Sequence, residues 1–366
     1  MQSKSTDSGE ASVYQARVCG YNDSPEQHAK MKGVARVWLA VCIAGILCAI
    51  PRRAKAEEFT FHAFGDAGWA DTHVGQPIYR RGYLNAYQRF DPGKRLIGDL
   101  NYINWETGVG NTCSQFWSRL SPSTYAFLSP TKDLKDAINH GFNVIGLANN
   151  HSYDCLESSE GNGPLQTYNN VKSIEREVAS SKFIFSGIYK SFDEESRVKI
   201  VRSTSKSIPI IFASAYVGGN ASHCKNILCA SELGELKSYF RNKKALRVLA
   251  LHSWNKNSHT QLKQILKNWV KEGLVDLAIG SGPHVAENIE IVPTDHGRKI
   301  LATSLGNFIH PSLAPQSNNS VLTTQWKYTQ DQEMQLLEAV NVQVSCDGEE
   351  CSQAKTTTLL KRGVKY

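Results

Sequence analysis

Apolar and polar positions follow two periods along the chain, which predict short strands and amphipathic helices. Residues 59–64 and 142–147 are short apolar runs followed by polar loop residues, a pattern typical of buried strands. We expect further strands at the end of 96–106 and at 183–185, 198–201, 208–213, 247–251, 274–279, 288–292, 299–302 and 336–344, and helices at 131–140, 164–179, 233–240 and 261–272. The alternation of strand and helix predicts a layered α/β fold.

The chain after residue 57 shows no internal repeat, no low-complexity linker and no break in composition. Residues 57–366 are therefore expected to form one domain. Residues 107–130 interrupt the regular pattern, because they form a long stretch rich in Ser, Pro, Gly and aromatic residues. A loop of that length is expected to be a functional insertion. Thr131 is expected to cap the helix that follows, and Gly141 to end it.

Five of the apolar segments end in a side chain that can bind a metal ion. The most informative is 142–147, which is followed by Asn149, Asn150 and His151. In open α/β sheets, ligands bind at the carboxyl ends of the strands. The full set of candidate ligands is Asp66, Glu106, Asn150, His151, His252 and His284.

Carboxylate, amide and imidazole donors together suit manganese, iron or zinc. A carboxylate can bridge two such ions, and two ions can clamp both the attacking and the leaving oxygen of a phosphoryl transfer. His151 can protonate a leaving group, because the ordinary pKa of histidine lies near neutrality.

Each of these residues also has an ordinary structural explanation. Asp66 alone would be a turn or cap residue, Glu106 a solvated loop residue, and Asn150 part of a turn. His252 or His284 alone would be a hydrogen-bonded histidine. Their occurrence together at five strand ends favours a metal site. Asp71-Thr72-His73 is a rival pair of ligands, but it does not follow a predicted strand.

Residues 1–56 have the features of an export signal. Lys32 and Arg36 precede an apolar run of 14 residues, 37–50, which is short for a membrane span. Ala54-Lys55-Ala56 then fits a small-x-small cleavage site, and Met31 is the better start for such a signal. The protein is therefore expected to be exported, as a periplasmic, secreted or membrane-anchored protein. Anchoring would follow if the segment stays uncleaved.

Six cysteines follow the leader, an even number that agrees with an oxidising compartment. Cys224 and Cys229 are close enough to close a small loop, and so are Cys346 and Cys351, which leaves Cys113 and Cys155 for each other. This is one of several connectivities that six cysteines allow. No pair has the two-residue spacing of a zinc knuckle, so a cysteine zinc site is not favoured.

The net charge of +7 comes mainly from the leader. Residues 1–56 hold 8 Lys and Arg against 4 Asp and Glu, so the remainder has 33 basic and 30 acidic residues, or +3. A nearly neutral body gives no reason to expect nucleic acid as a partner.

The ordered motifs resemble the CapA family, the bacterial poly-γ-glutamate capsule synthesis proteins of the calcineurin-like metallophosphoesterase superfamily. The resemblance spans about residues 59–310. It is carried by Gly65-Asp66, Asn104-Trp105-Glu106, Leu147-Ala148-Asn149-Asn150-His151, Leu251-His252, Gly280 to Val285, and Ser304-Leu305-Gly306-Asn307-Phe308.

This resemblance implies a four-layer α/β/β/α sandwich with a dinuclear centre. Asp66, Glu106 and His284 would hold one ion, and Glu106, Asn150 and His252 the other. His151 would take the acid/base role. The resemblance also implies an anionic envelope polymer, or a small phosphorylated or amide-linked precursor, as substrate, and a membrane-bound polymer synthase as partner.

The sequence departs from the family pattern at one position. The family segment resembles Gly-His-His-Pro-His-Val, whereas this chain has Gly280-Ser281-Gly282-Pro283-His284-Val285. Gly282 stands where a histidine for the second ion is expected, so one or two ions are anticipated. Ser281 offers an oxygen as a weaker substitute.

Two functions follow from these observations. The first is an exported metal-dependent hydrolase in which Arg80, Arg81 and Asn149 contact the substrate. The second is a non-catalytic polymer-binding or assembly subunit with a degraded metal site. The absence of a Gly-x-Ser-x-Gly stretch argues against a serine hydrolase, and that of a Walker-type loop against a nucleotide-driven enzyme.

Overall fold

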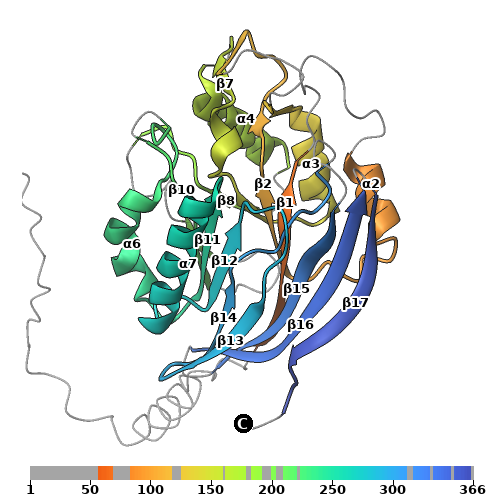
Figure 1. Ribbon diagram of the computed structural model, residues 1–366, viewed down its shortest axis with the longest axis vertical. Helices are drawn as coiled ribbons and strands as arrows, with labels where there is room; N and C mark the ends of the chain where they lie inside the picture. The colour runs from red at the N-terminus through yellow and green to blue at the C-terminus, as the bar shows by residue number, and fades with distance from the viewer. Residues whose placement is uncertain are drawn as a thin grey trace, which may run out of the picture. The chain divides into compact units, whose positions relative to one another are not determined.

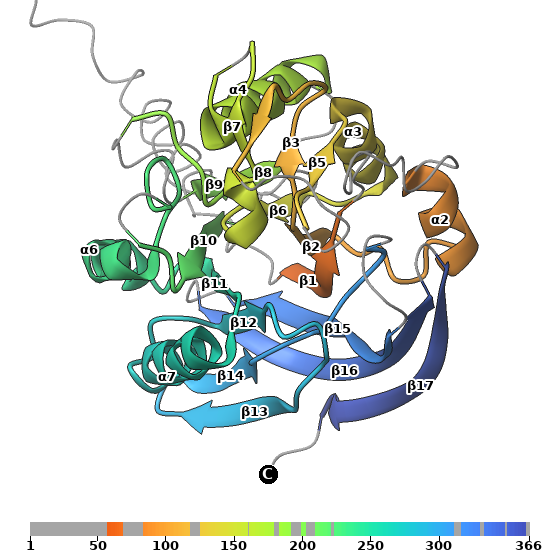
Figure 2. The same ribbon diagram turned by 45° about the horizontal axis from the view of Figure 1, so that its top comes forward.

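Two β-sheets stack face to face, and helices cover the outer face of each (Figures 1 and 2). The computed structural model describes residues 57–68, 83–117, 125–159, 161–178, 183–191, 199–202, 209–220, 223–310, 316–329, 333–347 and 350–363. All of them belong to the second of two compact units, residues 54–366. The layers form the α/β/β/α sandwich that the family resemblance implies.

The first sheet contains seven strands in the order β17-β16-β15-β1-β2-β6-β8. Its parallel half consists of β1 (Glu57–Ala67), β2 (Leu100–Trp105), β6 (Val144–Gly146) and β8 (Ile184–Ser186). Its antiparallel half consists of β15 (Gln316–Tyr328), β16 (Met334–Asp347) and β17 (Glu350–Leu360). Of this antiparallel half, the apolar pattern predicted only β16.

The second sheet contains six strands in the order β13-β14-β12-β11-β10-β9. Four of them are parallel neighbours: β14 (Gly297–Ala302), β12 (Leu277–Ser281), β11 (Leu246–Ser253) and β10 (Pro209–Val217). The edge strands β13 (Ile289–Thr294) and β9 (Lys199–Arg202) are antiparallel to their neighbours. The strands expected at 288–292 and 299–302 correspond to β13 and β14, which form an antiparallel hairpin.

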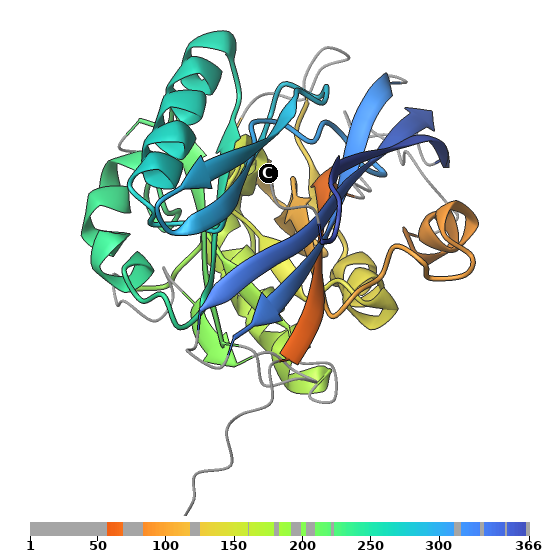
Figure 3. The same cartoon turned by 90° about the horizontal axis from the view of Figure 1, so that it is seen from below.

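The helices lie on opposite sides of the two sheets (Figure 3). The first sheet is covered by α2 (Tyr83–Phe90), α3 (Thr131–His140) and α4 (Gly163–Glu177), and the second by α6 (Leu233–Phe240) and α7 (Lys256–Lys271). The bounds of α3 and α6 are those predicted. Thr131 is not the cap of α3, because Pro130 holds that position and no side chain caps the helix.

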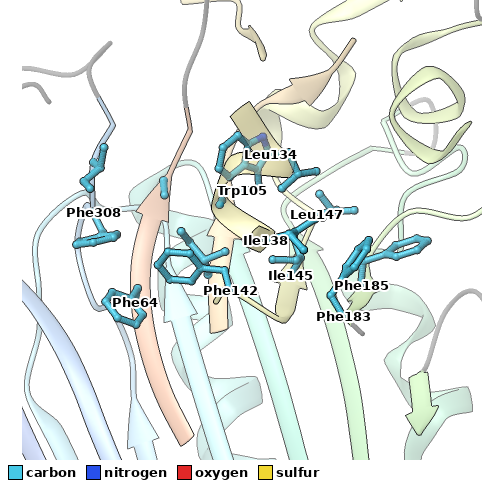
Figure 4. Packing of buried hydrophobic residues seen from close by; sticks show 14 of the residues in the cluster. Phe64, Trp105, Leu134, Ile138, Phe142, Ile145, Leu147, Phe183, Phe185 and Phe308 are labelled. Carbon is cyan, nitrogen blue, oxygen red and sulfur yellow. The ribbon is translucent and has the colours of Figure 1, made fainter. Parts of the chain in front are cut away.

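Alternate residues of each strand enter different core layers, as the two-residue period of a strand requires. In β11, Leu246, Val248 and Ala250 pack between the two sheets, whereas Leu249 and Leu251 pack against the helices. On the outer face of the first sheet, the strand residues Phe64 and Ile145, and Leu147 just after β6, pack with Leu134 and Ile138 of α3 (Figure 4).

Shorter elements shape the loops at one end of the sandwich. They are β3 (Gly108–Val109), β4 (Gln115–Phe116), β5 (Leu128–Ser129), β7 (Cys155–Glu157), and the 3-10 helices η1 (Asn150–Tyr153) and η2 (Ala230–Glu232). Three disulfides join Cys113 to Cys155, Cys224 to Cys229 and Cys346 to Cys351, which confirms the predicted pairing. Within the described residues, no helix is long and apolar enough to cross a membrane.

A buried ion network lies at the amino ends of the second sheet's strands. Arg247 donates from Nε and Nη2 to both carboxylate oxygens of Asp276, at 3.0 and 2.9 Å. Lys299 donates to Asp276 Oδ1 at 2.7 Å. Burial would raise the pKa of Asp276, but the hydrogen bonds and charges of Arg247 and Lys299 hold it below its ordinary value.

We expect Asp276→Asn to lower the free energy of unfolding by about 3–5 kcal/mol near neutral pH, because it leaves two buried cations unpaired. The folded pKa of Asp276 is depressed, so its stabilisation is complete above the ordinary pKa of 3.8 and is lost as the pH falls through the folded value. The difference between wild type and variant should therefore shrink in acid. Urea unfolding at several pH values measures it.

The matched control is Asp136→Asn, which removes a surface ion pair with Lys132 and should change the stability by less than about 1 kcal/mol. If Asp276→Asn unfolds at the same urea concentration as wild type, the network does not stabilise the fold as argued.

Candidate metal centre

Asp66 and Glu106 lie side by side because β1 and β2 are parallel neighbours. Strand pairing sets Asp66 opposite Asn104, after a register shift between Ala63 and Asp66. Glu106 follows β2, and its N–H donates to Ala67 O at 2.7 Å. Both acidic side chains are buried. Two carboxylates from distant parts of the chain therefore share the carboxyl edge of the first sheet.

His252 reaches the same point from the second sheet. It follows Leu246, Val248 and Ala250 in the two-residue period of β11, so its side chain enters the layer between the sheets. Its Nε2 lies 3.2 Å from Glu106 Oε1, and its Nδ1 lies 3.5 Å from Asp66 Oδ1. Ligand atoms of Asp66, Glu106 and His252 all lie within 4.8 Å of one another.

Polar neighbours fix the ring of His252. Its Nδ1 lies 2.9 Å from Ser281 Oγ and 3.1 Å from Asn104 Nδ2. Asn104 also donates to Asp66 Oδ1 at 2.7 Å, so one amide orients two candidate ligands. Ser281, suggested as an oxygen ligand, thus contacts the outer nitrogen of His252. Outer contacts of this kind orient metal-binding histidines.

Asn150 and His151 begin η1, directly beyond β6. Asn150 Oδ1 lies 2.6 Å from Nε2 of His252, which places it beside Glu106 Oε1. Asn149 is buried and uses its side chain locally, donating to Trp105 O at 2.9 Å and accepting from the His151 N–H at 3.0 Å. The structure therefore places Asn149 in the loop's own hydrogen bonds, outside the cavity lining.

His151 is held by Asp154, a residue that the sequence analysis missed. His151 Nδ1 lies 2.7 Å from Asp154 Oδ2, and that oxygen also accepts the Phe127 N–H at 2.6 Å. Burial lowers the pKa of His151, but the charge and hydrogen bond of Asp154 raise it above its ordinary value. The spacing Asn-His-x-x-Asp was visible in the sequence, but nothing in it showed that the two side chains meet.

His284 approaches the acids from the loop after β12. Its Nδ1 lies 4.0 Å from both Asp66 Oδ2 and Glu106 Oε2, and 2.8 Å from Asn307 Oδ1. Its backbone is in the left-handed region, with φ of 60°, which a non-glycine residue adopts only under strain. Both predicted ligand sets thus converge, and Glu106 is common to them.

The surroundings of the Glu106 carboxylate show whether this centre fits a cation. Neither of its carboxylate oxygens has a hydrogen-bond partner, although the residue is buried. Burial would raise its pKa, but the imidazoles of His252 and His284 hold it well below its ordinary value. A buried carboxylate whose oxygens accept no hydrogen bond is costly. A divalent ion would satisfy both oxygens, so these residues fit a metal.

The pKa of His252 reflects the same excess of negative charge. Burial lowers it, but the carboxylates of Glu106 and Asp66 raise it to about 10. Metal binding requires neutral imidazole, so an ion would displace that proton.

The structure explains why residue 282 is glycine. Its φ is 116°, and a Cβ at this position would lie 1.6 Å from Ser253 O. A histidine could not be accommodated there without moving β11 away from β12. The Gly282 N–H instead donates to Asp66 Oδ2 at 3.0 Å. Glycine is thus required at position 282, where the family pattern has histidine, because the backbone there lies close to that of Ser253.

A cavity of about 750 Å³ opens beside the centre, and Asn150, His151 and His284 form part of its lining. Arg80 and Arg81, the predicted substrate contacts, lie outside the described residues, as do Asp71 and His73 of the rival pair.

One of three comparisons with known proteins identifies a family for this chain. No curated protein matches this chain. A solved structure described as a novel phosphatase from Mycoplasma pneumoniae has 12% sequence identity and a TM-score of 0.45, over 80% of this chain and 95% of that one. At this level of similarity the match carries no argument. The model of the family described as bacterial capsule synthesis protein PGA_cap matches residues 71–312. Because this match spans well over half of the chain, the protein belongs to the PGA_cap family of bacterial capsule synthesis proteins.

Proposed function

We propose that this protein is an exported metal-dependent hydrolase that acts on an envelope polymer or on a phosphorylated or amide-linked precursor of it. The observation that carries the proposal is the buried carboxylate of Glu106, which accepts no well-formed hydrogen bond from the described residues and is approached only by the imidazoles of the candidate centre, among them His252 and His284. Such a group is costly unless it binds a cation. The donor set suits manganese, iron or zinc, as one or two ions.

Each residue has a defined task in this proposal. Asp66, Glu106 and His284 would hold one ion, and Glu106, Asn150 and His252 the other. When bound, a divalent transition metal polarises a phosphoryl or carbonyl oxygen and activates water. Asn104 orients Asp66 and His252, and Ser281 orients His252, by the hydrogen bonds described above.

His151 would supply the leaving group's proton. Asp154 accepts a hydrogen bond at Nδ1 of His151, which leaves Nε2 to carry a proton in the cavity. As the water oxygen forms its bond to phosphorus, the bond to the leaving oxygen breaks, and that oxygen takes the proton from Nε2. The water gives up one proton to solvent, and solvent reprotonates His151 after the product leaves.

Export is supported by the leader-like residues 1–56 and by three disulfides. As partner we propose a membrane-bound polymer synthase, because the family is one of capsule synthesis.

A non-catalytic polymer-binding or assembly subunit is the second candidate. Gly282 favours it, because the close approach to Ser253 removes one imidazole from the centre. Under this proposal the fold persists without tight metal binding.

We expect the purified protein to contain manganese, iron or zinc, and Glu106→Gln to weaken metal binding by more than about tenfold, because the shared carboxylate is lost. Elemental analysis and calorimetric titration measure this. The metal should also raise the melting temperature of wild type but not that of the variant. The control Asp136→Asn should behave like wild type. Absence of metal, with retained binding to an anionic polymer, would favour the second candidate.

We expect His151→Gln to reduce kcat for an alkyl phosphodiester by roughly 100-fold or more, with metal content unchanged. A p-nitrophenyl phosphodiester should be affected far less, because its leaving group needs no proton. Asp154→Asn should fall between wild type and His151→Gln, since an amide can still accept from Nδ1. An equal loss on both esters would argue against proton donation by His151.

A further inference from the structure

His310 is a buried histidine that neither the motifs nor the proposed mechanism uses. Its side chain is 0% exposed, and neither Nδ1 nor Nε2 has a hydrogen-bond partner. Buried polar groups normally have at least one partner. Two other buried histidines of this chain follow that rule: His62 Nδ1 lies 2.6 Å from Leu96 O, and His259 Nδ1 lies 3.1 Å from Ser253 Oγ. His310 needs a different explanation.

The ring of His310 lies beside the metal centre. Its Nε2 is 3.8 Å from Glu106 Oε2, the oxygen that also lies 4.0 Å from Nδ1 of His284. Glu106 Oε1, in contrast, lies nearest to His252. His310 is therefore on the side of Glu106 where Asp66 and His284 approach each other.

The surroundings of the ring are closely packed. A Cβ at Gly68 would lie 2.6 Å from Thr107 Cγ2, which is too close, and at an ordinary contact distance of 3.5 Å from His310 Nε2. Phe127 packs against the ring, with centroids 5.3 Å apart and an angle of 63° between the planes. A neighbouring apolar ring offers no hydrogen bond, so packing alone does not account for an imidazole here.

We propose that His310 is a further metal ligand, which joins Asp66, Glu106 and His284 in holding the first ion. The chain thus lacks an imidazole at position 282 and supplies one at position 310. The first ion would have four protein ligands, and the second, held by Glu106, Asn150 and His252, only three. The two ions should bind with unequal affinity.

This inference rests on the proposed metal centre, and the experiment separates the two. Chelator-treated protein is titrated calorimetrically with Mn²⁺. Wild type should bind two ions in steps of unequal affinity. His310→Phe, which keeps a ring against Phe127, should weaken the tighter step by more than about tenfold and leave the weaker step within about twofold. His140→Phe is the matched control, because His140 is another buried histidine packed on an aromatic ring, that of Tyr87.

If wild type binds no metal, both the centre and the role of His310 are overturned. If wild type binds metal and His310→Phe binds it equally, only the role of His310 is overturned. Should that variant fail to fold, X-ray absorption of zinc-loaded wild type decides, since His252, His284 and His310 predict three imidazoles around the ions and two would contradict the proposal.

A second, independent observation concerns the cavity beside the centre. The described residues include four large apolar side chains that are exposed, and three of them, Trp117, Tyr125 and Trp254, line this cavity. Such gathering of exposed apolar groups marks a binding surface. The described lining contains no Lys or Arg, and its polar groups include Asn220 and His223.

On one side of the cavity, the backbone at Trp117 is held by the chain around it. The Trp117 N–H donates to Asp154 O at 2.9 Å, and the nearby Cys113–Cys155 disulfide ties the same two segments together. The rings of Trp117 and Tyr153 both lie near that of His223, with centroids 6.4 and 6.1 Å apart. Trp117 and Tyr153 thus have a neighbour that restricts their motion, and a preorganised ring binds a partner at a lower entropic cost.

We infer that the cavity binds a neutral sugar ring of the polymer or precursor. The C–H face of a pyranose packs on indole and phenol rings, while its hydroxyls bond to amides and imidazoles. This inference names the substrate class of the proposed hydrolase, and binding tests it without turnover.

Calorimetry with a panel of neutral oligosaccharides, a γ-glutamyl oligomer and AMP provides the test. We expect an oligosaccharide to bind most tightly, and Trp254→Ala to weaken it by roughly tenfold, whereas Trp254→Tyr should retain binding within about threefold. Tighter binding of the γ-glutamyl oligomer or of AMP, failure of the whole panel, or unchanged binding by Trp254→Ala would each overturn the inference, whether or not the protein is a hydrolase.

Discussion

The burial of two carboxylates at one strand edge is the constraint on which the rest of the site depends. Asp66 has hydrogen bonds from Asn104 and Gly282, whereas Glu106 has none at either oxygen. Removing an ionised carboxylate from water is among the largest costs that a fold can bear. The imidazoles of His252 and His284 offset part of this cost, and a divalent ion would offset more. The site is therefore organised to receive positive charge.

The sandwich architecture makes this concentration of charge feasible. The strands of both sheets carry apolar residues into a shared layer between the sheets. A ligand at a strand end faces the other sheet when it lies an even number of residues from these apolar residues, because alternate side chains point to opposite faces. His252 is the next alternate residue of β11 after Leu246, Val248 and Ala250, so its side chain points to the same face. The same core that stabilises the fold therefore aims the site residues, and the Arg247–Asp276 network fixes the opposite ends of β11 and β12.

The candidate site residues at strand ends could be predicted from the sequence, whereas those in loops could not. Asp66, Glu106 and His252 follow apolar runs, so their convergence could be predicted from the carboxyl-edge rule. The strands β15 and β17 were not predicted, because β17 is largely exposed and polar and β15 carries few consecutive apolar residues. Asp154 and His310 reach the site through loop geometry, which no local pattern encodes.

The segment Ser304 to Phe308 supplies none of the predicted metal ligands, but its hydrogen bonds hold two of them in place. The Asp66 N–H donates to Gly306 O at 2.9 Å, and the backbone O of Asp66 accepts the Phe308 N–H at 2.6 Å, so the segment pairs with the carboxyl end of β1. Asn307 then holds His284. The motif is specific because it fixes the backbone of one candidate ligand and the side chain of another. It also leads directly to His310, so the segment that orients the centre would supply a ligand to it as well.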